Sequence, residues 1–157
     1  MLDDDLTAFL ESGCAMIAGF LTPDGEPFAS RAWGLEVVDA ARGIVRVLLG
    51  EADVVRVDPL GAGSPALALT GTEVATLRSA QVKGRIERID PPSADDLRRT
   101  ERYCDEFFGA VERVDRFARA LTARLTPADL LVATVQLDEV FDQTPGPQAG
   151  TRLAGAS

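Results

Sequence analysis

The spacing of hydrophobic positions changes several times along the chain, and each change predicts a new element. Near the start, apolar residues recur at helical spacing from Leu2 to Leu10. Asp3, Asp4 and Asp5 lie at the start of this stretch, and negative charge favours the N-terminus of a helix. Gly13 is suited to end a helix. We therefore expect a short helix over residues 3–12.

Residues 14–90 carry the spacing of β-strands with one helical interval. The stretch Thr22-Pro23-Asp24-Gly25 has turn chemistry, so the strands on either side of it should form a hairpin. After it we expect a third strand over 43–50 and then a short helix that ends before Asp58-Pro59, with Val54, Val55 and Val57 on one face. A fourth strand should follow over 64–73, broken at Gly71. A long fifth strand is expected over 74–90, with a bend near Gly84.

The second half of the chain contains a helical segment and one more strand. Ser93 is a good N-cap, and helical spacing continues from there over 93–125, with Gly109 as the expected division between two helices. A last strand is expected over 130–142, followed by an irregular Pro/Gly-rich tail over 143–157. Turn-linked strands in this order predict a single mainly β domain over 1–157, an antiparallel sheet curled into a β-barrel with flanking helices.

Charge and composition narrow the classes of function. The chain carries a net charge of −9, which opposes binding to a nucleic-acid backbone. Its acidic start lacks the basic and apolar regions of a signal peptide, and no segment reaches the length of a membrane span. We expect a cytoplasmic protein that binds neither nucleic acid nor membrane.

The absence of histidine excludes several kinds of site by counting. A Cys/His zinc site, a Ser-His-Asp or Cys-His nucleophile and a haem with an axial His all need a residue that the chain lacks. Cys14 and Cys104 are far apart and have no metal-binding spacing, so we interpret them as small buried apolar residues. No metal site is predicted.

Lys83 is the only lysine; the other fifteen basic residues are arginine. It lies in the fifth predicted strand, two residues before Arg85 and therefore on the same face. This face either meets an anionic ligand, with Lys83 as a site cation, or is a plain surface on which Glu87 matches Lys83. Gly84 either lets a ligand approach the backbone or allows the strand to bend.

Three short stretches in this order resemble the pyridoxamine 5′-phosphate oxidase-like, FMN-binding split-barrel family. They are Thr22-Pro23-Asp24-Gly25-Glu26-Pro27 on the first hairpin, Leu49-Gly50 at the end of the third strand, and Gln81-Val82-Lys83-Gly84-Arg85 on the fifth; the ending Val140–Pro147 is also similar to small members. The resemblance covers about residues 5–145. It implies that the barrel is an antiparallel split β-barrel of the FMN-binding type, and that two chains form a homodimer with a flavin in a groove between the subunits. The cofactor-binding residues that it implies are Arg31, Ser30, Trp33, Leu48, Leu49, Gln81, Lys83 and Arg85.

The chain departs from the family where the cofactor phosphate is expected. Arg31 falls on one position that holds the phosphate in family members. It either binds the phosphate here or is an exposed strand arginine paired with a nearby acid. Full members carry Ser-Arg-Lys after Leu-Gly, whereas this chain has Glu51-Ala52-Asp53, and a further expected lysine is Glu36. Each charge-assisted bond to a phosphate contributes about 1.5–3 kcal/mol, so two lost cations weaken FMN binding by roughly two to four powers of ten.

Two functions follow from the resemblance. The first is an FMN-dependent oxidoreductase of unassigned substrate, in which the flavin supplies the redox chemistry and the catalytic side chains are unknown. The second is a non-enzymatic dimeric module that has lost FMN or binds another ligand, such as a deazaflavin. Trp33 packs either on a ring system, at a dimer interface or in the core. The tail from Asp142 either crosses the partner subunit or is only an ordered terminus.

Overall fold

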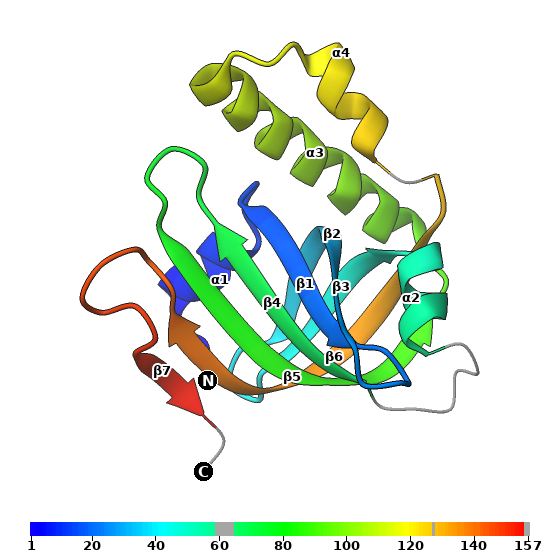
Figure 1. Ribbon diagram of the computed structural model, residues 1–157, viewed down its shortest axis with the longest axis vertical. Helices are drawn as coiled ribbons and strands as arrows, with labels where there is room; N and C mark the ends of the chain where they lie inside the picture. Colours follow the sequence, from blue (N-terminus) through cyan, green and yellow to red (C-terminus); the bar gives the residue numbers. More distant parts are fainter. Residues whose placement is uncertain (59–64, 127, 156–157) are drawn as a thin grey trace.

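Six antiparallel strands close into a barrel in the computed structural model, which describes residues 1–58, 65–126 and 128–155 (Figure 1). The strand order is β3-β2-β1-β4-β5-β6, and pairing of β3 with β6 closes the ring. The fold is mainly β, with 43% of the described residues in strands and helices on the flanks, as predicted. The barrel strands are β1 Ala15–Leu21, β2 Pro27–Asp39, β3 Ile44–Gly50, β4 Ala66–Thr72, β5 Ser79–Asp90 and β6 Leu130–Asp142.

The helices begin at residues suited to cap them. Helix α1 (Asp4–Leu10) has Asp3 as its N-cap, whose carboxylate accepts the Leu6 N–H at 2.8 Å. Helix α3 (Ala94–Asp115) begins with a reciprocal capping box between Ser93 and Asp96. Helix α2 is Glu51–Val57, α4 is Arg119–Thr122 and a 3₁₀ turn, η1, is Ala123–Leu125.

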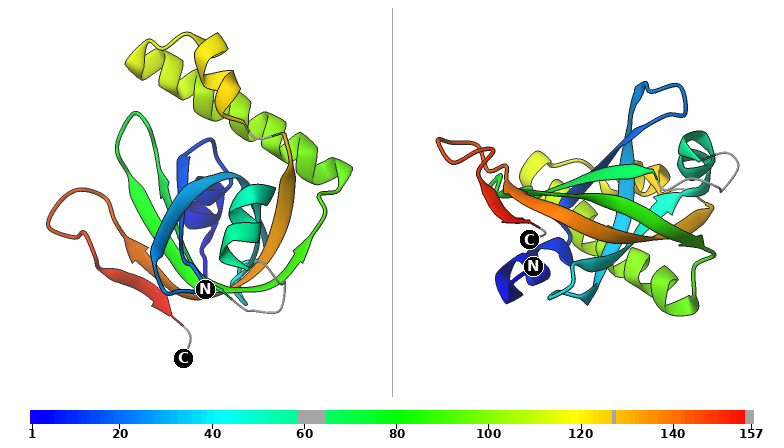
Figure 2. Two further views of the ribbon diagram at one scale, coloured as in Figure 1. Left: turned by 45° about the vertical axis from the view of Figure 1, so that its right-hand side comes forward. Right: turned by 90° about the horizontal axis from the view of Figure 1, so that it is seen from below.

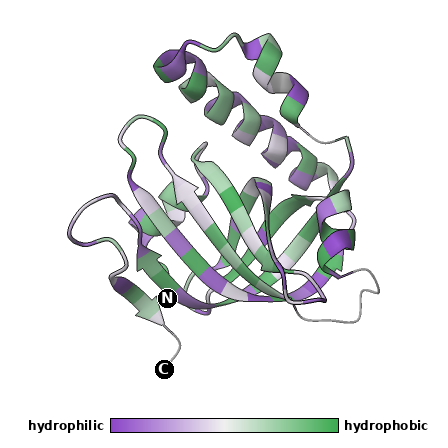
Figure 3. Cartoon of the chain, viewed as in Figure 1, coloured by the Kyte–Doolittle hydropathy of each residue, from purple (hydrophilic) through white to green (hydrophobic). Residues whose placement is uncertain are grey.

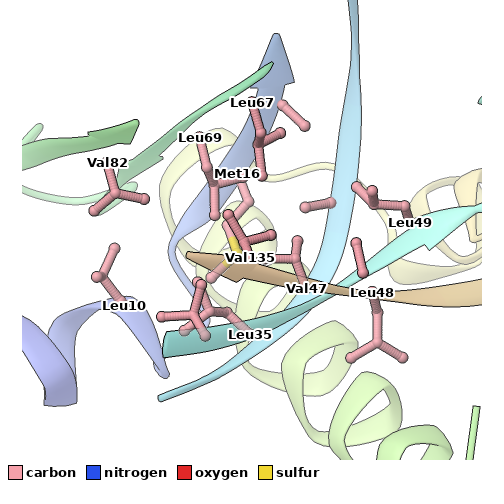
Figure 4. Close-up of a cluster of buried hydrophobic side chains, with 14 of the residues drawn as sticks. Leu10, Met16, Leu35, Val47, Leu48, Leu49, Leu67, Leu69, Val82 and Val135 are labelled. Carbon is pink, nitrogen blue, oxygen red and sulfur yellow. The ribbon is translucent and has the colours of Figure 1, made fainter. Parts of the chain in front are cut away.

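Alternate residues of each barrel strand point inward and form the core (Figure 4). Ala18, Leu69, Val82 and Val140 are successive partners across β1, β4, β5 and β6, and all four are buried. This is the pattern expected of a barrel whose interior is filled by side chains. Hydrophobic and hydrophilic positions follow one another along the barrel strands in the hydropathy view (Figure 3).

Helix α3 lies on the outer surface of β2 and is held there by a network of charges (Figures 1 and 2). Arg46 on β3 donates to Asp96 at 2.8 Å and to Glu36 at 3.2 Å, and Arg99 on α3 also pairs with Glu36 at 2.9 Å. Burial opposes ionisation of Asp96, but hydrogen bonds from Ser93 and the Arg46 charge outweigh it and lower its pKa. Glu36, which stands where the family resemblance leads one to expect a lysine, thus has a structural role.

The structure corrects the predicted boundaries in the second half of the chain. The tail over 143–157 is not wholly irregular, because β7 (Arg152–Gly155) pairs with the outer half of β6. The predicted helical segment is interrupted at Arg116, whose left-handed backbone (φ 58°) ends α3, and not at Gly109. Ser79 N–H donates to Thr144 at 3.0 Å, so the first tail residues are tied to β5 of their own chain.

Smaller corrections concern β4, β5 and α2. Strand β4 runs through Gly71 without a break. Residues 74–78, predicted as strand, form the turn before β5. In α2, Val54 and Val57 are buried but Val55 is 52% exposed, so the three valines do not share one face. The helix ends at Val57 as expected, while Pro59 lies outside the described residues.

No helix in the described part of the chain combines the length and the apolar character needed to cross a membrane.

Candidate functional site

A groove of about 590 Å³ crosses the outer surface of the barrel along one row of paired residues. Strand pairing places five residues in this row, one each on β2, β1, β4, β5 and β6. Paired residues of neighbouring antiparallel strands point to the same side of a sheet, so the row forms a continuous strip. In order, it consists of Ala29, Gly19, Ala68, Lys83 and Glu139, and all five line the groove.

The floor of the groove is flat because its first three positions carry almost no side chain. A Cβ added to Gly19 would lie 3.6 Å from the carbonyl oxygen of Ala68, which is ordinary contact. The backbone therefore does not require glycine at this position. Together with Ala29 and Ala68, it leaves a smooth apolar surface of the kind on which a planar ring can lie.

Gly84, in contrast, is required by the packing of two strands. A Cβ at this position would lie 2.1 Å from the carbonyl oxygen of Gln136 on β6, closer than any real contact. The pairing of β5 with β6 shifts register between Lys83 and Gly84, as in a β-bulge. Of the two alternatives left by the sequence, close strand approach with a bend therefore accounts for this glycine.

Two cations stand at the β5 side of the floor. Lys83 and Arg85 are both exposed and both line the groove. The Lys83 ammonium lies 4.7 Å from the centroid of the Phe141 ring, within the range of a cation–π contact. Among the ion pairs of the described residues, none includes either cation, so Glu87 does not match Lys83.

Two acids on β6 complete this side of the groove. Glu139 is the strand partner of Lys83 and pairs with Arg152 on β7 at 3.3 Å. Asp138 is exposed and lines the same groove. The groove therefore has an apolar floor, two cations without an ion pair in the described part of the chain, and two acids at its edge, one of which is paired with Arg152.

Arg31 lies in the next row, beneath α3 and outside the groove. Its guanidinium carbon is 4.6 Å from the Phe107 ring centroid and 5.8 Å from that of Trp33. Its Nε and Nη2 atoms are buried and have no hydrogen-bond partner among the residues that the structure describes. Arg31 is therefore packed among aromatic rings and is not paired with an acid in the described residues.

The neighbouring hydroxyl of Tyr103 is also enclosed by α3 and the barrel. It accepts the Met16 N–H at 3.3 Å. Burial raises the pKa of this phenol well above its usual range, and the nearby Arg31 charge offsets only part of that rise. Tyr103 is therefore a neutral structural residue that helps to hold α3 on β1.

The remaining predicted site residues do not reach the groove. Ser30 faces α2 and donates a hydrogen bond to Asp53. Trp33 is 4% exposed, which agrees with the core alternative, and Leu48 and Leu49 are fully buried. Gln81 lies on the outer face, where its amide donates to Thr70 at 2.9 Å. The structure thus brings only Lys83 and Arg85 of the eight predicted residues together in the groove.

The start of α2, where the resemblance places the phosphate of FMN, forms an acidic cavity of about 380 Å³. Its lining includes Glu51, Asp53 and Asp129 and no cation among the described residues. A phosphate there would face three carboxylates, and like charges at close range repel strongly. The residues present therefore do not fit FMN bound in that manner. The described residues also contain no cluster of side chains suited to a metal ion.

A third cavity, of about 410 Å³, lies between α3 and α4 beside Cys104. The thiol is 3.6 Å from the hydroxyl of Thr126, and its burial raises its pKa. Cys14 is 2% exposed in the core, and burial raises its pKa to about 11. Both thiols are therefore protonated at neutral pH. The interpretation of the cysteines as small buried residues is confirmed for Cys14, whereas Cys104 is only partly buried.

Comparison with known proteins identifies the fold. No protein-family model matches the chain, and no curated protein matches it by sequence. An F420 reductase structure is 17% identical with a TM-score of 0.54 over 85% of this chain and 93% of that one. HupZ of Group A Streptococcus is 11% identical, with a TM-score of 0.53 over 96% of this chain and 100% of that one. A Lactobacillus delbrueckii protein assigned as a pyridoxamine 5′-phosphate oxidase is 14% identical, with a TM-score of 0.51 over 89% of this chain and 93% of that one. The chain therefore has the split β-barrel fold that the sequence predicted.

Proposed function

We propose that this chain, a split β-barrel similar in fold to an F420 reductase, binds a flavin-type ring in the groove and serves as an oxidoreductase. The observation that carries the proposal is the strip of Gly19, Ala29 and Ala68 beside Lys83. It offers a flat apolar support for a planar ring and a cation at one edge of that support. A flavin-type ring, when bound, supplies the hydride or electron chemistry.

The role of Lys83 follows from its position at the edge of the floor. An ammonium beside an electron-rich ring edge stabilises negative charge there, because the attraction is strong in a partly desolvated groove. Phe141, under the ammonium, restricts where the charge can lie. Lys83 is therefore the chain's own contribution to tuning the ring, and Arg85 adds a second positive charge for an anionic substituent.

Among flavin-type cofactors, we favour a deazaflavin over FMN. The acids of α2 oppose the phosphate position that the resemblance implies for FMN. A cofactor whose anionic tail runs toward Arg85 avoids these acids and meets a cation that forms no ion pair within the described part of the chain. The fold similarity to an F420 reductase agrees with this preference but does not by itself carry it.

We further propose that two copies of the chain form the complete site. The floor supports only one face of a planar ring, and the opposite side of the groove is open to solvent along β1, where Leu21 is 54% exposed. A ring lying on this floor would expose its other face unless a second copy covered it. Burial of both faces is what gives such ligands most of their affinity.

A fluorescence titration with three ligands tests the proposal: riboflavin, FMN and coenzyme F420. We expect all three rings to be bound, F420 most tightly, and Lys83→Gln to weaken F420 binding by about tenfold or more, the loss of one charge-assisted contact. Arg88→Gln, which removes a positive charge from β5 outside the groove, should leave the affinity unchanged. Unaltered fluorescence of all three ligands at high micromolar protein would refute the proposal.

The second candidate is a non-enzymatic module, and the acidic cavity at α2 is the observation that favours it. Loss of the phosphate-binding cations is expected in a chain that no longer needs a flavin cofactor. The same titration separates an oxidoreductase from a module that has lost flavin-type ligands altogether, because such a module binds none of the three rings. Binding of other planar anions to the groove would then be measured, and their affinities for the unmodified protein and for Lys83→Gln would be compared.

A further inference from the structure

The cavity between α3 and α4, of about 410 Å³, shares no lining residue with the groove on the barrel (Figure 1). Its lining on α3 forms two rows with helical spacing, Thr100, Cys104 and Phe108 in one row and Glu101 and Asp105 in the other. Residues four apart on a helix lie on the same side, one turn after another. The cavity therefore follows α3 for about 12 Å, at about 1.5 Å per residue. Its volume is in the usual range of small-molecule pockets.

The hydroxyl of Thr100 lies at one end of the cavity. Thr100 is 5% exposed, and its Oγ1 atom is buried without a hydrogen-bond partner in the part of the chain that the structure describes. A buried hydroxyl without a partner is unfavourable, because it has left water and gained no new contact. The other hydroxyl of the lining, that of Thr126, is already 3.6 Å from the Cys104 sulfur. A ligand with a hydrogen-bonding group at this end would supply the partner that Thr100 lacks.

The charges of the lining determine which kind of group fits there. Arg119 on α4 pairs with the carboxylate of Asp105 and also donates to its carbonyl oxygen at 3.4 Å. Glu101 is exposed and takes part in none of the ion pairs of the described residues. An anion beside Thr100 would therefore meet the Glu101 carboxylate, while the described cation of the lining is engaged elsewhere. An ammonium group has donors for both the Thr100 oxygen and this carboxylate.

The other end of the cavity is apolar. Phe108 is 3% exposed and lies two turns along α3 from Thr100. Cys104, between them, is partly buried, and a protonated thiol behaves as a small apolar group that packs well on aromatic rings. The lining thus changes from polar to apolar along α3. A molecule with a positive charge at one end and an apolar body matches this change.

We propose that this cavity binds a small organic amine. Its ammonium group donates to the Thr100 hydroxyl oxygen and to the Glu101 carboxylate, and its apolar body extends past Cys104 to Phe108. The site lies between helices and shares no residue with the groove, so the inference does not rest on the binding of a flavin-type ring. It also gives Cys104 a use as a reporter, because a bound ligand covers the thiol.

The first test is isothermal titration calorimetry with three compounds of similar shape: phenethylamine, phenethyl alcohol and hydrocinnamate. For a molecule of this size we expect phenethylamine to bind with a dissociation constant of about 1 mM or below. The neutral alcohol should bind about tenfold more weakly, since it lacks the charge-assisted contact to Glu101. Hydrocinnamate, which carries a carboxylate, should not bind. Binding of hydrocinnamate in preference to phenethylamine would overturn the proposal.

Two variants test the polar end of the cavity. Thr100→Val and Glu101→Gln should each weaken phenethylamine binding by about tenfold, because each removes one partner of the ammonium. Thr100→Val keeps the shape of the side chain and removes a buried hydroxyl without a partner, so the melting temperature of the free protein should be unchanged or higher. Glu112→Gln is the matched control, because Glu112 is an exposed acid of α3 outside the cavity. It should leave the affinity unchanged.

The rate at which iodoacetamide modifies Cys104 locates the bound amine. At ten times its dissociation constant, phenethylamine should slow this reaction by about tenfold, because only the free protein exposes the thiol. Hydrocinnamate at the same concentration should have no effect. Binding of phenethylamine without protection of Cys104 would place the amine elsewhere and overturn the proposal. An equal loss of affinity in Glu112→Gln and Glu101→Gln would also overturn it, since the net charge of −9 would then attract the amine without a defined site.

Discussion

The hydroxyl of Ser30 on β2 donates a hydrogen bond to the carboxylate of Asp53 on α2. This contact joins the strand and the helix at the place where the resemblance to FMN-binding proteins implies a phosphate. The Ser30 hydroxyl and the Asp53 carboxylate are hydrogen-bond partners there, and Glu51 adds another negative charge to the same cavity. The structure thus explains in atomic terms why this chain should discriminate against a phosphate at α2.

Restoring the cations at α2 should restore affinity for a phosphate. We expect the triple variant Glu51→Ser/Ala52→Arg/Asp53→Lys to bind FMN at least about tenfold more tightly, because each charge-assisted contact contributes about 1.5–3 kcal/mol. Riboflavin, which lacks the phosphate, is the control ligand and should be bound as before. Fluorescence titration measures both affinities. An FMN-to-riboflavin affinity ratio that does not change would contradict the assignment of α2 as the phosphate position.

The two glycines of β1 and β5 should respond differently to the same change. Gly84→Ala forces the new Cβ onto the Gln136 carbonyl, so it should lower the free energy of unfolding by about 1–3 kcal/mol or more. Gly19→Ala places its Cβ in ordinary contact and should be neutral or slightly stabilising. Urea denaturation followed by circular dichroism compares the two. Equal losses would show that the register of β5 and β6 is not as described.

The contact between Asp96 and Arg46 should make the stability of the protein depend on pH. The pKa of Asp96 is lower in the folded state, so its stabilising effect is present above its ordinary pKa of 3.8 and disappears as the pH falls through the folded value. Asp96→Asn should therefore lower the free energy of unfolding by about 1–3 kcal/mol at neutral pH. Below about pH 4, the free energy of unfolding of Asp96→Asn should approach that of the unmodified protein.

Asp95→Asn is the matched control for this experiment. Asp95 pairs with Arg98 on the same helix, but its side chain is 82% exposed, and exposed pairs contribute little. Urea denaturation between pH 3 and pH 7 should show a pH-dependent deficit for Asp96→Asn and none for Asp95→Asn. A constant deficit across this range would mean that Asp96 acts through packing and not through its charge.

The two cysteines should react at different rates with a thiol reagent. Cys14 is buried and its pKa is raised to about 11, so almost no thiolate is present at pH 8. Cys104 is only partly buried and borders a cavity. We expect one fast equivalent of modification in the native protein and a second only in denaturant. Cys104→Ser should abolish the fast equivalent; its persistence would contradict the described burial of Cys14.

The sequence predicted the barrel because local chemistry was informative. The turn at residues 22–25, the cap at Ser93 and the alternation within the strands each specify one element. The tail was harder, because β7 is a four-residue strand formed only by pairing with β6, and such a short strand has little local signal. The end of α3 at Arg116 was also not predicted. Glycine adopts a left-handed backbone more readily than arginine does, so the sequence favoured Gly109, seven residues earlier, as the division between the helices.

The candidate site shows where sequence reasoning stops. Lys83 stood out in the sequence because it is the only lysine, and it stays a prediction as a site residue. Gly19, Ala29 and Ala68 line the same groove but gave no signal, since each is unremarkable alone and only strand register makes them one floor. Arg31 was predicted as a site residue from its motif position, and nothing in the sequence indicated that it lies close to the rings of Trp33 and Phe107. Paired strands far apart in the chain determine the groove, and a single sequence does not specify their register.

The most direct test of the account is the binding of a flavin-type ring to Gly19→Leu, compared with the unmodified protein. The leucine side chain points outward and fills the floor, while the backbone tolerates a Cβ at this position. We expect an unchanged melting temperature and a loss of ring binding of at least about a hundredfold, measured by quenching of F420 fluorescence, since a blocked floor removes most of the buried apolar contact. A folded variant that binds the ring as tightly as the unmodified protein would show that the groove is not the binding site.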